Sequence, residues 1–501
     1  MPVYCIVSCT VPTPRERRER VSEQRHIQLW RLKGLDINFN SLRGFAALAP
    51  WHLQCPSSTQ NLGFGVHRTM ETSIDAVNVA VVDAKLMSRS IFSYGAHLRL
   101  PVTGHSRYGN DLAKFSFRKK SHIVNYLQFL NPAITNLAMP YPETTDAFAV
   151  NDTKNWSTFK RQELPLKKFE ETDVDIAIDA CGVCASDVHT ITGGWGDDIP
   201  LPLCVGHEVI GKVVRVGSKV TRVKVGDRAG IGAQIGADLT CGNCKADQEN
   251  YCENQIDTYG AKHTDGTVAQ GGYSSHIRGN EYFVFKIPDN LDTALAAPML
   301  CAGLTTYSPL KRLGAGPGKK VAIVGLGGLG HFGVLWSVAL GAETYVISHS
   351  ASKKNDAMKM GAKDFIVTNE KGWNEKHKFK FDFIINTADA TDKFDLSAYF
   401  STLKVGGTFH MVGFPDNPLP AMQAQIFAPN GCYMGASHIG NRPEMEEMFE
   451  LASKQNIKSW VQEIPLSEAG IKEAVERVYK NDNVRYRITL TKFDDVFGKR
   501  A

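Results

Sequence analysis

The chain has 501 residues, more than a single hydrophobic core usually supports, so the sequence predicts two or more domains. Apolar residues make up 43% and charged residues 22%, which is typical of a globular enzyme and excludes a disordered or fibrous chain. No uninterrupted apolar stretch reaches about 18 residues, which argues against a transmembrane helix, and we expect a cytoplasmic protein.

The net charge of +5 is concentrated in the first part of the chain. Residues 1–138 contain 17 Lys and Arg against 8 Asp and Glu, whereas the remaining residues contain 40 against 44. Nucleic-acid binding by the main body therefore has no electrostatic support. The 11 cysteines are too sparse and too unevenly spaced for a disulfide scaffold, and their clustering between Cys181 and Cys301 suggests metal binding.

Residues 1–138 differ in texture from the rest. Arg15 to Arg20 alternate in charge, and no sustained period of 3.6 or 2 follows them. The acidic residues Glu16, Glu19 and Glu23 count against a mitochondrial transit peptide. No aromatic and basic platform accompanies the charge, so we do not expect a nucleic-acid-binding tail. We expect an appendage without a stable fold of its own.

A β-rich domain is predicted from residue 139 to about 298. Residues 173–180 (DVDIAIDA) alternate as in a half-buried strand, and residues 209–220 form a second β-rich run before a turn. Helical patterns in residues 443–454 and 467–478 follow much later, and we expect the chain from 436 to 501 to return to this domain.

Residues 299–435 predict a different architecture. A buried strand in KKVAIVG runs into a glycine-rich turn and then an apolar helix that ends at Gly341. Further strands are predicted in TYVIS, DFIV, FDFIINTA and GGTFHMVGF, with a helix in KKNDAMKMGA. Alternating strands and helices of this kind build a doubly wound parallel sheet, so the fold class is α/β.

The glycine-rich turn matches the GxGxxG pattern of dinucleotide-binding sites. It follows a predicted strand and opens a predicted helix, which is the context that the pattern requires. Its residues are Gly325, Leu326, Gly327, Gly328, Leu329 and Gly330. Glycines allow the tight turn, the approach of a pyrophosphate and close packing, while the helix N-terminus offers free N–H groups to a phosphate. A glycine-rich loop without a ligand is the alternative.

The end of the next predicted strand distinguishes NADP from NAD. NAD sites usually carry Asp or Glu there, about 20 residues after the glycines. This chain has Ser348, His349 and Ser350, followed by Lys353 and Lys354. Hydroxyl groups and cations suit the 2′-phosphate of NADP, and we expect NADP(H). A solvated helix start is the alternative interpretation of the lysines.

Two sets of residues have the chemistry of zinc ligands. The first is Cys184, His207 and Cys301, with Glu208 beside the histidine; three ligands leave a position for water or substrate. A core histidine and buried cysteines are the structural alternative. The second set is Cys241, Cys244 and Cys252, a partial zinc-lobe spacing for which Asp238 can supply the fourth ligand. A CxxC redox pair is the alternative here, but no adjacent thioredoxin-like pattern supports it.

Together these motifs resemble the zinc-dependent medium-chain alcohol dehydrogenases, and within them the NADP-dependent branch similar to cinnamyl alcohol dehydrogenases. The matching stretches run in family order from about Met139 to the C-terminus, so residues 1–138 are foreign to the family. They include ACGVCASDVHTITGGWG, LPLCVGHEVIGKVVRVGSKV, CGNCKADQENYC, VAIVGLGGLGHFGV and NVRYRITL.

The resemblance implies a GroES-like catalytic domain (139–298 and 436–501), a Rossmann domain (299–435) and commonly a homodimer. It implies that Cys184, His207 and Cys301 hold a catalytic zinc, that Glu208 can approach this metal, and that Asp238, Cys241, Cys244 and Cys252 hold a structural zinc. Asp238 stands where the branch usually has Cys, and His349 where it commonly has Arg.

The resemblance also assigns residues to the substrate and cofactor. Ser186 matches the hydroxyl that touches the substrate oxygen, His189 the outer member of a proton relay, and Thr305 a position near the nicotinamide. The implied reaction interconverts alcohols and aldehydes of aromatic, cinnamyl or medium-chain aliphatic type by hydride transfer with NADP(H). Trp195 either lines the substrate pocket or is structural.

Two other functions compete with this reading. A zinc-independent quinone or enoyl reductase keeps the Rossmann half but does not need Cys184, His207 and Cys301. A non-catalytic NADPH-binding protein keeps the fold alone. The joint presence of the three predicted ligands favours the zinc enzyme.

Overall fold

The computed structural model describes residues 143–196, 198–389 and 394–500, together with the backbone of four short strands earlier in the chain. These are β1 (Val7–Cys9) paired with β2 (Val77–Val79), and β3 (Leu98–Arg99) paired with β4 (Lys114–Phe115), both antiparallel. The chain divides into two units, Met1–Pro140 and Tyr141–Ala501. Apart from these strands, the expectation of an unfolded appendage in residues 1–138 lies outside the described residues.

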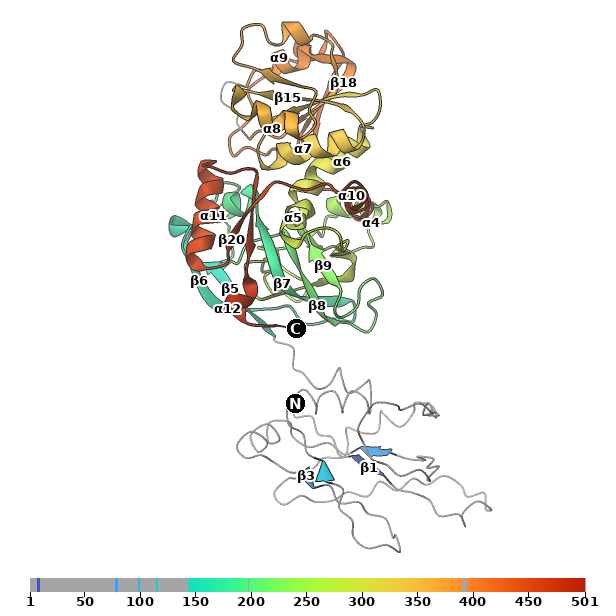
Figure 1. Ribbon diagram of the computed structural model, residues 1–501, viewed down its shortest axis with the longest axis vertical. Helices are drawn as coiled ribbons and strands as arrows, with labels where there is room; N and C mark the ends of the chain where they lie inside the picture. Colours follow the sequence, from blue (N-terminus) through green and yellow to red (C-terminus); the bar gives the residue numbers. More distant parts are fainter. Residues whose placement is uncertain are drawn as a thin grey trace, which may run out of the picture. The chain divides into compact units, whose positions relative to one another are not determined.

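The second unit contains two large sheets, and each is the centre of a separate domain (Figure 1). We call the part around the seven-stranded sheet the β domain and the part around the six-stranded sheet the α/β domain. Among the residues that the structure describes, no helix is both long and apolar enough to cross a membrane.

The β domain is built on a mostly antiparallel sheet. Its strand order is β13-β9-β8-β7-β21-β20, with β12 also paired to β7, and only the β20–β21 pair is parallel. The strands are β7 (Asp173–Val183), β8 (Val209–Val216), β9 (Arg228–Ile231), β12 (His276–Asn280), β13 (Val284–Lys286), β20 (Val461–Pro465) and β21 (Arg487–Thr491). The last two come from the end of the chain, so this sheet needs both ends of the second unit.

Smaller elements surround this sheet. Two antiparallel pairs flank it, β5 (Thr144–Val150) with β6 (Phe159–Pro165) and β10 (Gln234–Gly236) with β11 (Ile256–Asp257). The helices are α3 (Ala185–Thr192), α4 (Gly242–Lys245), α5 (Thr293–Ala296), α11 (Glu468–Lys480) and α12 (Phe493–Phe497). Short 3-10 turns lie at Thr153–Asn155, Glu249–Tyr251, Glu281–Phe283 and Ala297–Leu300.

Strand β7 corrects the expectation of a half-buried strand. Its acidic residues Asp173 and Asp175 are buried rather than solvated. Each has a cationic partner: Lys167 Nζ lies 2.6 Å from Asp173, and Arg278 Nε lies 2.7 Å from Asp175. At Asp173 and Asp175 the alternation therefore reflects buried ion pairs, whereas Asp179, the third acidic residue of the pattern, is exposed as predicted.

The α/β domain has a six-stranded parallel sheet in the order β16-β15-β14-β17-β18-β19. Numbered along the chain, this is the order 3-2-1-4-5-6 of doubly wound dinucleotide-binding folds. The strands are β14 (Lys320–Val324), β15 (Glu343–Ser348), β16 (Asp364–Val367), β17 (Phe381–Asn386), β18 (Leu403–Met411) and β19 (Tyr433–Ala436). The helices are α7 (Gly328–Ala339), α8 (Lys354–Lys359) and α9 (Leu396–Ser401), with 3-10 turns at Ala351–Lys353, Glu375–His377 and Ala424–Phe427. The predicted α/β fold is confirmed.

Two helices join the domains. They are α6 (Ala302–Arg312) and α10 (Arg442–Gln455), which lie in a core that also includes Ile210 of the β domain and Val321 of the α/β domain. Fully buried Trp336 of α7 donates its indole N–H to the carbonyl of Gly303 at 3.0 Å, which ties α7 to α6.

Candidate active site

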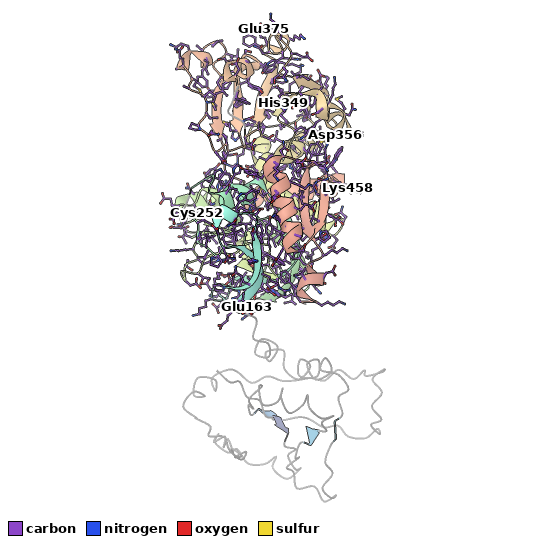
Figure 2. The ribbon with its side chains drawn as sticks, turned by 90° about the vertical axis from the view of Figure 1, so that its left-hand side faces the viewer. Glu163, Cys252, His349, Asp356, Glu375 and Lys458 are labelled. Carbon is purple, nitrogen blue, oxygen red and sulfur yellow. The ribbon has the colours of Figure 1, made fainter. Side chains whose placement is uncertain are left out.

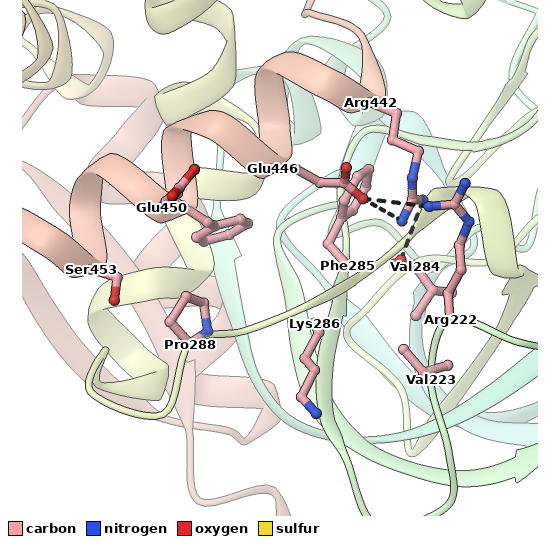
Figure 3. A pocket seen from close by; sticks show the side chains of 11 residues that line it. Arg222, Val223, Val284, Phe285, Lys286, Pro288, Arg442, Glu446, Glu450 and Ser453 are labelled. Carbon is pink, nitrogen blue, oxygen red and sulfur yellow. Dashed lines mark hydrogen bonds and ion pairs between the residues drawn. The ribbon is translucent and has the colours of Figure 1, made fainter.

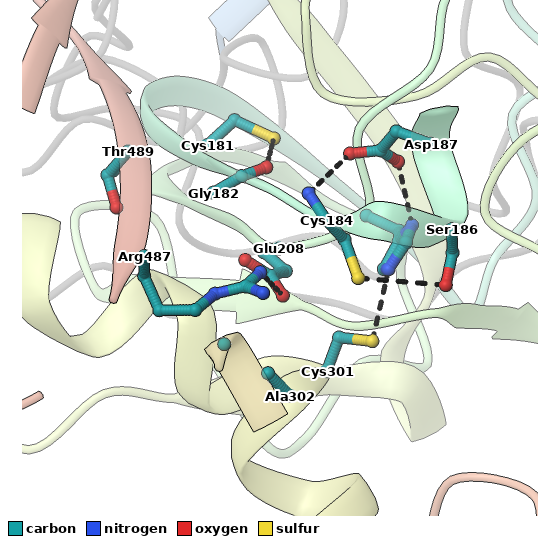
Figure 4. A network of polar contacts seen from close by, with 12 residues as sticks. Cys181, Gly182, Cys184, Ser186, Asp187, Glu208, Cys301, Ala302, Arg487 and Thr489 are labelled. Carbon is teal, nitrogen blue, oxygen red and sulfur yellow. Dashed lines mark hydrogen bonds and ion pairs between the residues drawn. The ribbon is translucent and has the colours of Figure 1, made fainter. Parts of the chain in front are cut away.

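The first set of predicted ligands comes together in the β domain (Figure 4). Cys184 lies between β7 and α3 and is the N-cap of α3. His207 and Glu208 directly precede β8, and Cys301 directly precedes α6. One ligand atom from each of the four residues lies within 4.8 Å of the others, and all four are buried. Three distant segments of the chain thus converge on one point.

A buried carboxylate orients the histidine of this cluster. The Nδ1 of His207 lies 3.0 Å from Oδ1 of Asp187, and its Nε2 lies 3.0 Å from Sγ of Cys301. Asp187 also accepts hydrogen bonds from the backbone N–H of Cys184 and from the hydroxyl of Tyr273. Because an ionised carboxylate only accepts, Nδ1 carries a proton, and Nε2 is the ring nitrogen that faces the thiols.

The burial of these groups shifts their protonation. A hydrogen bond from Cys301 lowers the pKa of Cys184 well below its ordinary value, against the effect of burial, and His207 lowers it further. The same hydrogen bond and burial raise the pKa of Cys301. Burial raises the pKa of Glu208 to about 7, although Arg487 opposes this. One thiolate is therefore favoured in the cluster even without a metal.

The donor set fits a zinc ion. Two sulfur atoms and an imidazole nitrogen are ligands that zinc accepts, and three protein ligands leave its fourth position open. The Oε2 atom of Glu208 is buried without a hydrogen-bond partner, and it occupies space that a side chain at Gly182 would fill. A bound cation would satisfy this buried charge.

Arg487, to which sequence reasoning gave no role, connects this cluster to the glycine-rich turn. Its Nη2 lies 2.5 Å from Oε1 of Glu208, and both side chains are buried. Its Nη1 lies 2.7 Å from where a Cβ at Gly328 would be. A lone Arg in the apolar strand β21 was the available signal, but the sequence does not show what it contacts.

Ser186, His189 and Thr305 lie on helices beside the cluster. Ser186 Oγ is 3.6 Å from the Cys184 sulfur, and His189 follows three residues later on α3. Thr305 is half-buried on α6, and its backbone N–H donates to the carbonyl of Cys301 at 2.8 Å. The ring of Trp195 stacks on that of His189 with centroids 4.8 Å apart.

The glycine-rich turn has the predicted conformation. Gly325 directly follows β14 and has φ +84°, a value that favours glycine, and Gly327 is the N-cap of α7. A Cβ at Gly330 would lie 2.0 Å from the carbonyl oxygen of Gly325, so only glycine lets the helix pack this closely. Gly328 and Leu329 form the first turn of α7.

The residues predicted to hold the 2′-phosphate lie after β15. Ser348 ends this strand and is half-buried, and His349 is exposed (Figure 2). The Nζ of Lys353 donates to the carbonyl of Leu326 at 2.8 Å, so its charge lies against the glycine-rich turn. Arg485, which sequence reasoning missed, pairs with Asp356 of the adjacent helix α8 at 3.4 Å.

The second set of predicted ligands also comes together. Ligand atoms of Asp238, Cys241, Cys244 and Cys252 lie within 4.8 Å of one another. Oδ1 of Asp238 accepts the backbone N–H of Cys241 at 3.0 Å and faces the Cys244 sulfur at 3.5 Å. Backbone N–H groups lower the pKa of Asp238, which keeps it ionised. The set fits a metal whose fourth ligand is a carboxylate.

A separate cavity of about 440 Å³ lies between α10 and β13 (Figure 3). It is lined in part by Arg222, Phe285 and Arg442, and none of the predicted site residues borders it. Its two arginines both pair with Glu446, at 3.6 Å and 2.7 Å.

Comparison with known proteins identifies the family. Residues 170–289 match the model of the alcohol dehydrogenase GroES-like domain, and residues 328–454 match that of the zinc-binding dehydrogenases. The chain is 45% identical to NADP-dependent alcohol dehydrogenase 6 of Saccharomyces cerevisiae over 362 residues, which are 72% of this chain and all of that protein. It is 41% identical to NADP-dependent alcohol dehydrogenase C 1 of Mycolicibacterium smegmatis over 64% of this chain and 90% of that one.

Solved structures agree with this assignment. A cinnamyl alcohol dehydrogenase from Sorghum bicolor superposes with a TM-score of 0.66 at 32% identity, covering 70% of this chain and 97% of that one. The Helicobacter pylori cinnamyl alcohol dehydrogenase complexed with NADP(H) gives 0.64 at 31% identity, with coverages of 70% and 98%. With the two clusters and the glycine-rich turn in family order, the chain belongs to the zinc-dependent medium-chain alcohol dehydrogenases, in the branch similar to cinnamyl alcohol dehydrogenases, and is an alcohol oxidoreductase.

Proposed function

We propose that this enzyme interconverts primary alcohols and aldehydes, of aromatic, cinnamyl or medium-chain aliphatic type, with zinc and NADP(H). The observation that carries the proposal is the convergence of Cys184, His207 and Cys301, joined to the glycine-rich turn through Glu208 and Arg487. The names of the relatives, NADP-dependent alcohol and cinnamyl alcohol dehydrogenases, support the same reaction.

The proposed catalytic zinc is held by Cys184, His207 and Cys301. When bound, the metal would supply a Lewis acid for the substrate oxygen, and the nicotinamide would exchange a hydride with the substrate carbon. Asp187 keeps the proton of His207 on Nδ1, so that Nε2 is available as a ligand. Glu208 supplies a carboxylate that can approach the metal, while Arg487 restrains it.

The proton of the alcohol leaves through α3. Ser186 lies beside Cys184 and is proposed to contact the substrate oxygen. His189, on the same helix, accepts the proton from this relay and passes it to water, because an imidazole nitrogen can both accept and donate a proton. Thr305 is proposed to contact the nicotinamide from α6.

The dinucleotide is proposed to bind at Gly325, Gly327, Gly328, Leu329 and Gly330, with its pyrophosphate at the N-terminus of α7. Lys353, Ser348 and His349 are proposed to hold the 2′-phosphate. The position of the Lys353 ammonium against the carbonyl of Leu326 supports this, because it places a cation beside the turn.

A structural zinc is proposed at Asp238, Cys241, Cys244 and Cys252. A carboxylate is a harder ligand than a thiolate, so we expect this site to bind zinc more weakly than a four-cysteine lobe would. The packing of the four ligand atoms within 4.8 Å supports the proposal.

The assembly, location and domain boundaries are also proposals. We propose a homodimer, which is common in this family; the exposed edge strand β19, with Tyr433 66% exposed, is a surface that a second copy can cover. The cytoplasmic location and the boundaries at 138, 298 and 435 stay predictions.

The test is zinc content together with turnover. Purified chain is analysed for metal by mass spectrometry, and NADPH oxidation is followed with cinnamaldehyde, benzaldehyde and hexanal. We expect zinc in the protein and reduction of at least one aldehyde, both lost in Cys184→Ser. Full turnover by zinc-free protein would contradict the zinc mechanism and favour a zinc-independent reductase. NADPH binding without turnover would favour a non-catalytic binding protein.

A further inference from the structure

His189 faces a carboxylate that comes from the other domain. Its Nδ1 lies 2.8 Å from Oδ1 of Asp416, which lies in the segment between β18 and the 3-10 turn at Ala424–Phe427. His189 itself lies on α3 of the β domain. The contact therefore spans from the helix that carries the proposed proton relay to the α/β domain.

The contact fixes which nitrogen of the ring carries a proton. An ionised carboxylate has no hydrogen to donate, so Nδ1 must be the donor. Nε2 then has a free lone pair, and no group among the described residues forms a hydrogen bond with it. A neutral imidazole in this state is ready to accept a proton at Nε2.

The turn after α3 is shaped around this contact. Trp195 stacks on the imidazole at an interplanar angle of 11°, which fixes the plane of the ring. A Cβ at Gly194 would lie 2.8 Å from Oδ1 of Asp416, so the glycine leaves room for the carboxylate. Among the described residues, Asp416 is the charged group that contacts the His189 ring.

We propose that Asp416 is a positioning residue for the proton relay, and that it makes the relay depend on the approach of the two domains. The inference rests on the proposed function, in which His189 receives the alcohol proton. In oxidation, the alcohol O–H bond breaks, the proton passes through Ser186 to the Nε2 lone pair, and the hydride leaves the carbon for NADP⁺. The imidazolium keeps its Nδ1–H bond to Asp416 and then releases the Nε2 proton to water.

Asp416 does not take the proton in this scheme. It holds the ring and the tautomer, and its negative charge favours the imidazolium that forms transiently. Because the Nδ1–Oδ1 distance joins two domains, a small separation of the domains breaks the contact. The relay is then complete only in a domain arrangement that keeps this contact, as in the structure.

The test compares variants of the full-length, zinc-loaded enzyme with cinnamyl alcohol and NADP⁺. We expect Asp416→Ala to lower the single-turnover rate of oxidation about tenfold, the scale found when the partner of a functional histidine is removed. The KM for NADP⁺ and the zinc content should not change. The single-turnover rate of Asp416→Asn should lie between those of the parent and the alanine variant. The amide oxygen of the new side chain still accepts a hydrogen bond from Nδ1–H but carries no charge. Asn417→Ala, an exposed neighbour in the same segment, is the control and should match the parent.

A double-mutant cycle separates positioning from a structural effect. His189→Gln should lower the rate by about a hundredfold, the lower range for a general base. If Asp416 acts through His189, adding Asp416→Ala to His189→Gln should not lower the single-turnover rate any further. Full additivity of the two losses, or parent-like rates in Asp416→Ala, would overturn the inference.

The same cycle distinguishes failure of this inference from failure of the proposed function. If oxidation is slow in His189→Gln but as fast as the parent in Asp416→Ala, only the role of Asp416 is contradicted. If His189→Gln oxidises the alcohol as fast as the parent, the proposed proton relay is contradicted, and this inference with it. A solvent deuterium isotope effect in the parent that disappears in His189→Gln supports proton transfer through this residue.

Discussion

Glu208 and Arg487 form a buried ion pair that links the two candidate binding regions. Oε1 of Glu208 lies 2.5 Å from Nη2 of Arg487, while the other carboxylate oxygen remains without a partner beside Cys184 and Cys301. Glu208 precedes β8 and Arg487 begins β21, so residues far apart in the chain meet between the thiols and the glycine-rich turn. The charge at the first set of predicted ligands is thus coupled to the glycine-rich turn.

Arg487→Met should destabilise the enzyme strongly. Removing one partner leaves Glu208 as an uncompensated buried charge, which typically costs about 3–5 kcal/mol of unfolding free energy. The double variant Arg487→Met/Glu208→Gln should recover part of this loss. Denaturant unfolding of the three proteins provides the measurement, and a double variant no more stable than Arg487→Met would show that the pair is not the cause.

Cys184→Ser should abolish turnover and leave NADPH binding intact. The substitution removes the thiolate whose pKa is lowered in the cluster, whereas the glycine-rich turn lies in the other domain. Zinc content and the change in NADPH fluorescence are measured on the same preparation. Substantial activity in a variant that holds no catalytic zinc would contradict the assignment.

Asp238→Ala should weaken the second zinc, and Asp238→Cys should tighten it. The carboxylate is held in place by the backbone N–H groups of Thr240 and Cys241, at 2.8 Å and 3.0 Å, and thiolate is the softer ligand. Zinc retained per chain is followed during titration with a chelator. If Asp238→Ala retains zinc as the parent does, Asp238 is not a ligand.

Ser348→Asp combined with Lys353→Ala should shift the cofactor preference toward NAD. Charge-assisted hydrogen bonds contribute roughly 1.5–3 kcal/mol each, so two of them give a preference for NADP on the order of 100-fold or more. The double variant removes a cation and adds a carboxylate beside the ribose. The kcat/KM values for NADPH and NADH are compared, and an unchanged preference would place the phosphate site elsewhere.

His331 should make the enzyme less stable in acid. Burial lowers the pKa of this histidine to about 3 from an ordinary value of 6.5. Its Nε2 has no hydrogen-bond partner, and its ring stacks on Tyr486. The stabilisation that comes from burying the neutral imidazole is fully present above pH 6.5. As the pH falls toward 3, the unfolded chain binds a proton that the folded chain does not, so stability falls by up to about 1.4 kcal/mol per pH unit.

His331→Phe keeps an aromatic ring and removes this proton. The variant loses the contact between Nδ1 and the carbonyl of Gly328, and we expect it to be less stable than the parent at pH 8. Its unfolding free energy should nevertheless decline less steeply than that of the parent between pH 6.5 and 4. Parallel curves for the two proteins would show that His331 is protonated in the folded state.

The parts of the site that the sequence predicts are those encoded by local spacing. The glycines from Gly325 to Gly330 lie within one turn, and Cys241 and Cys244 are separated by two residues, so short-range geometry alone constrains them. Strands β14 to β18 and helices α7 and α8 were predicted for the same reason, because each of them carries its own periodicity, whereas α9 and β19 were not predicted.

The parts that the sequence does not predict depend on long-range contacts. Arg487 and Asp416 meet Glu208 and His189 only after the chain has folded, and the residues next to each of them do not indicate its partner. Asp175 was misread as a solvated position because its partner Arg278 lies on another strand. The pairing of charges across sheets and domains depends on tertiary structure and produces no periodic pattern in the sequence.

Because strands β20 and β21 follow the α/β domain in the sequence, the two domains are completed at different stages of synthesis. The parallel sheet of the α/β domain uses one continuous segment, from Lys320 to Ala436, and can form while the chain is still growing. Strand β7 pairs with β21 only at Cys181–Val183, and β21 (Arg487–Thr491) is synthesised after the whole α/β domain. Until then this end of β7 lacks the partner that β21 later provides and can bind other extended chains. The β domain, which begins first, is therefore completed after the domain that follows it.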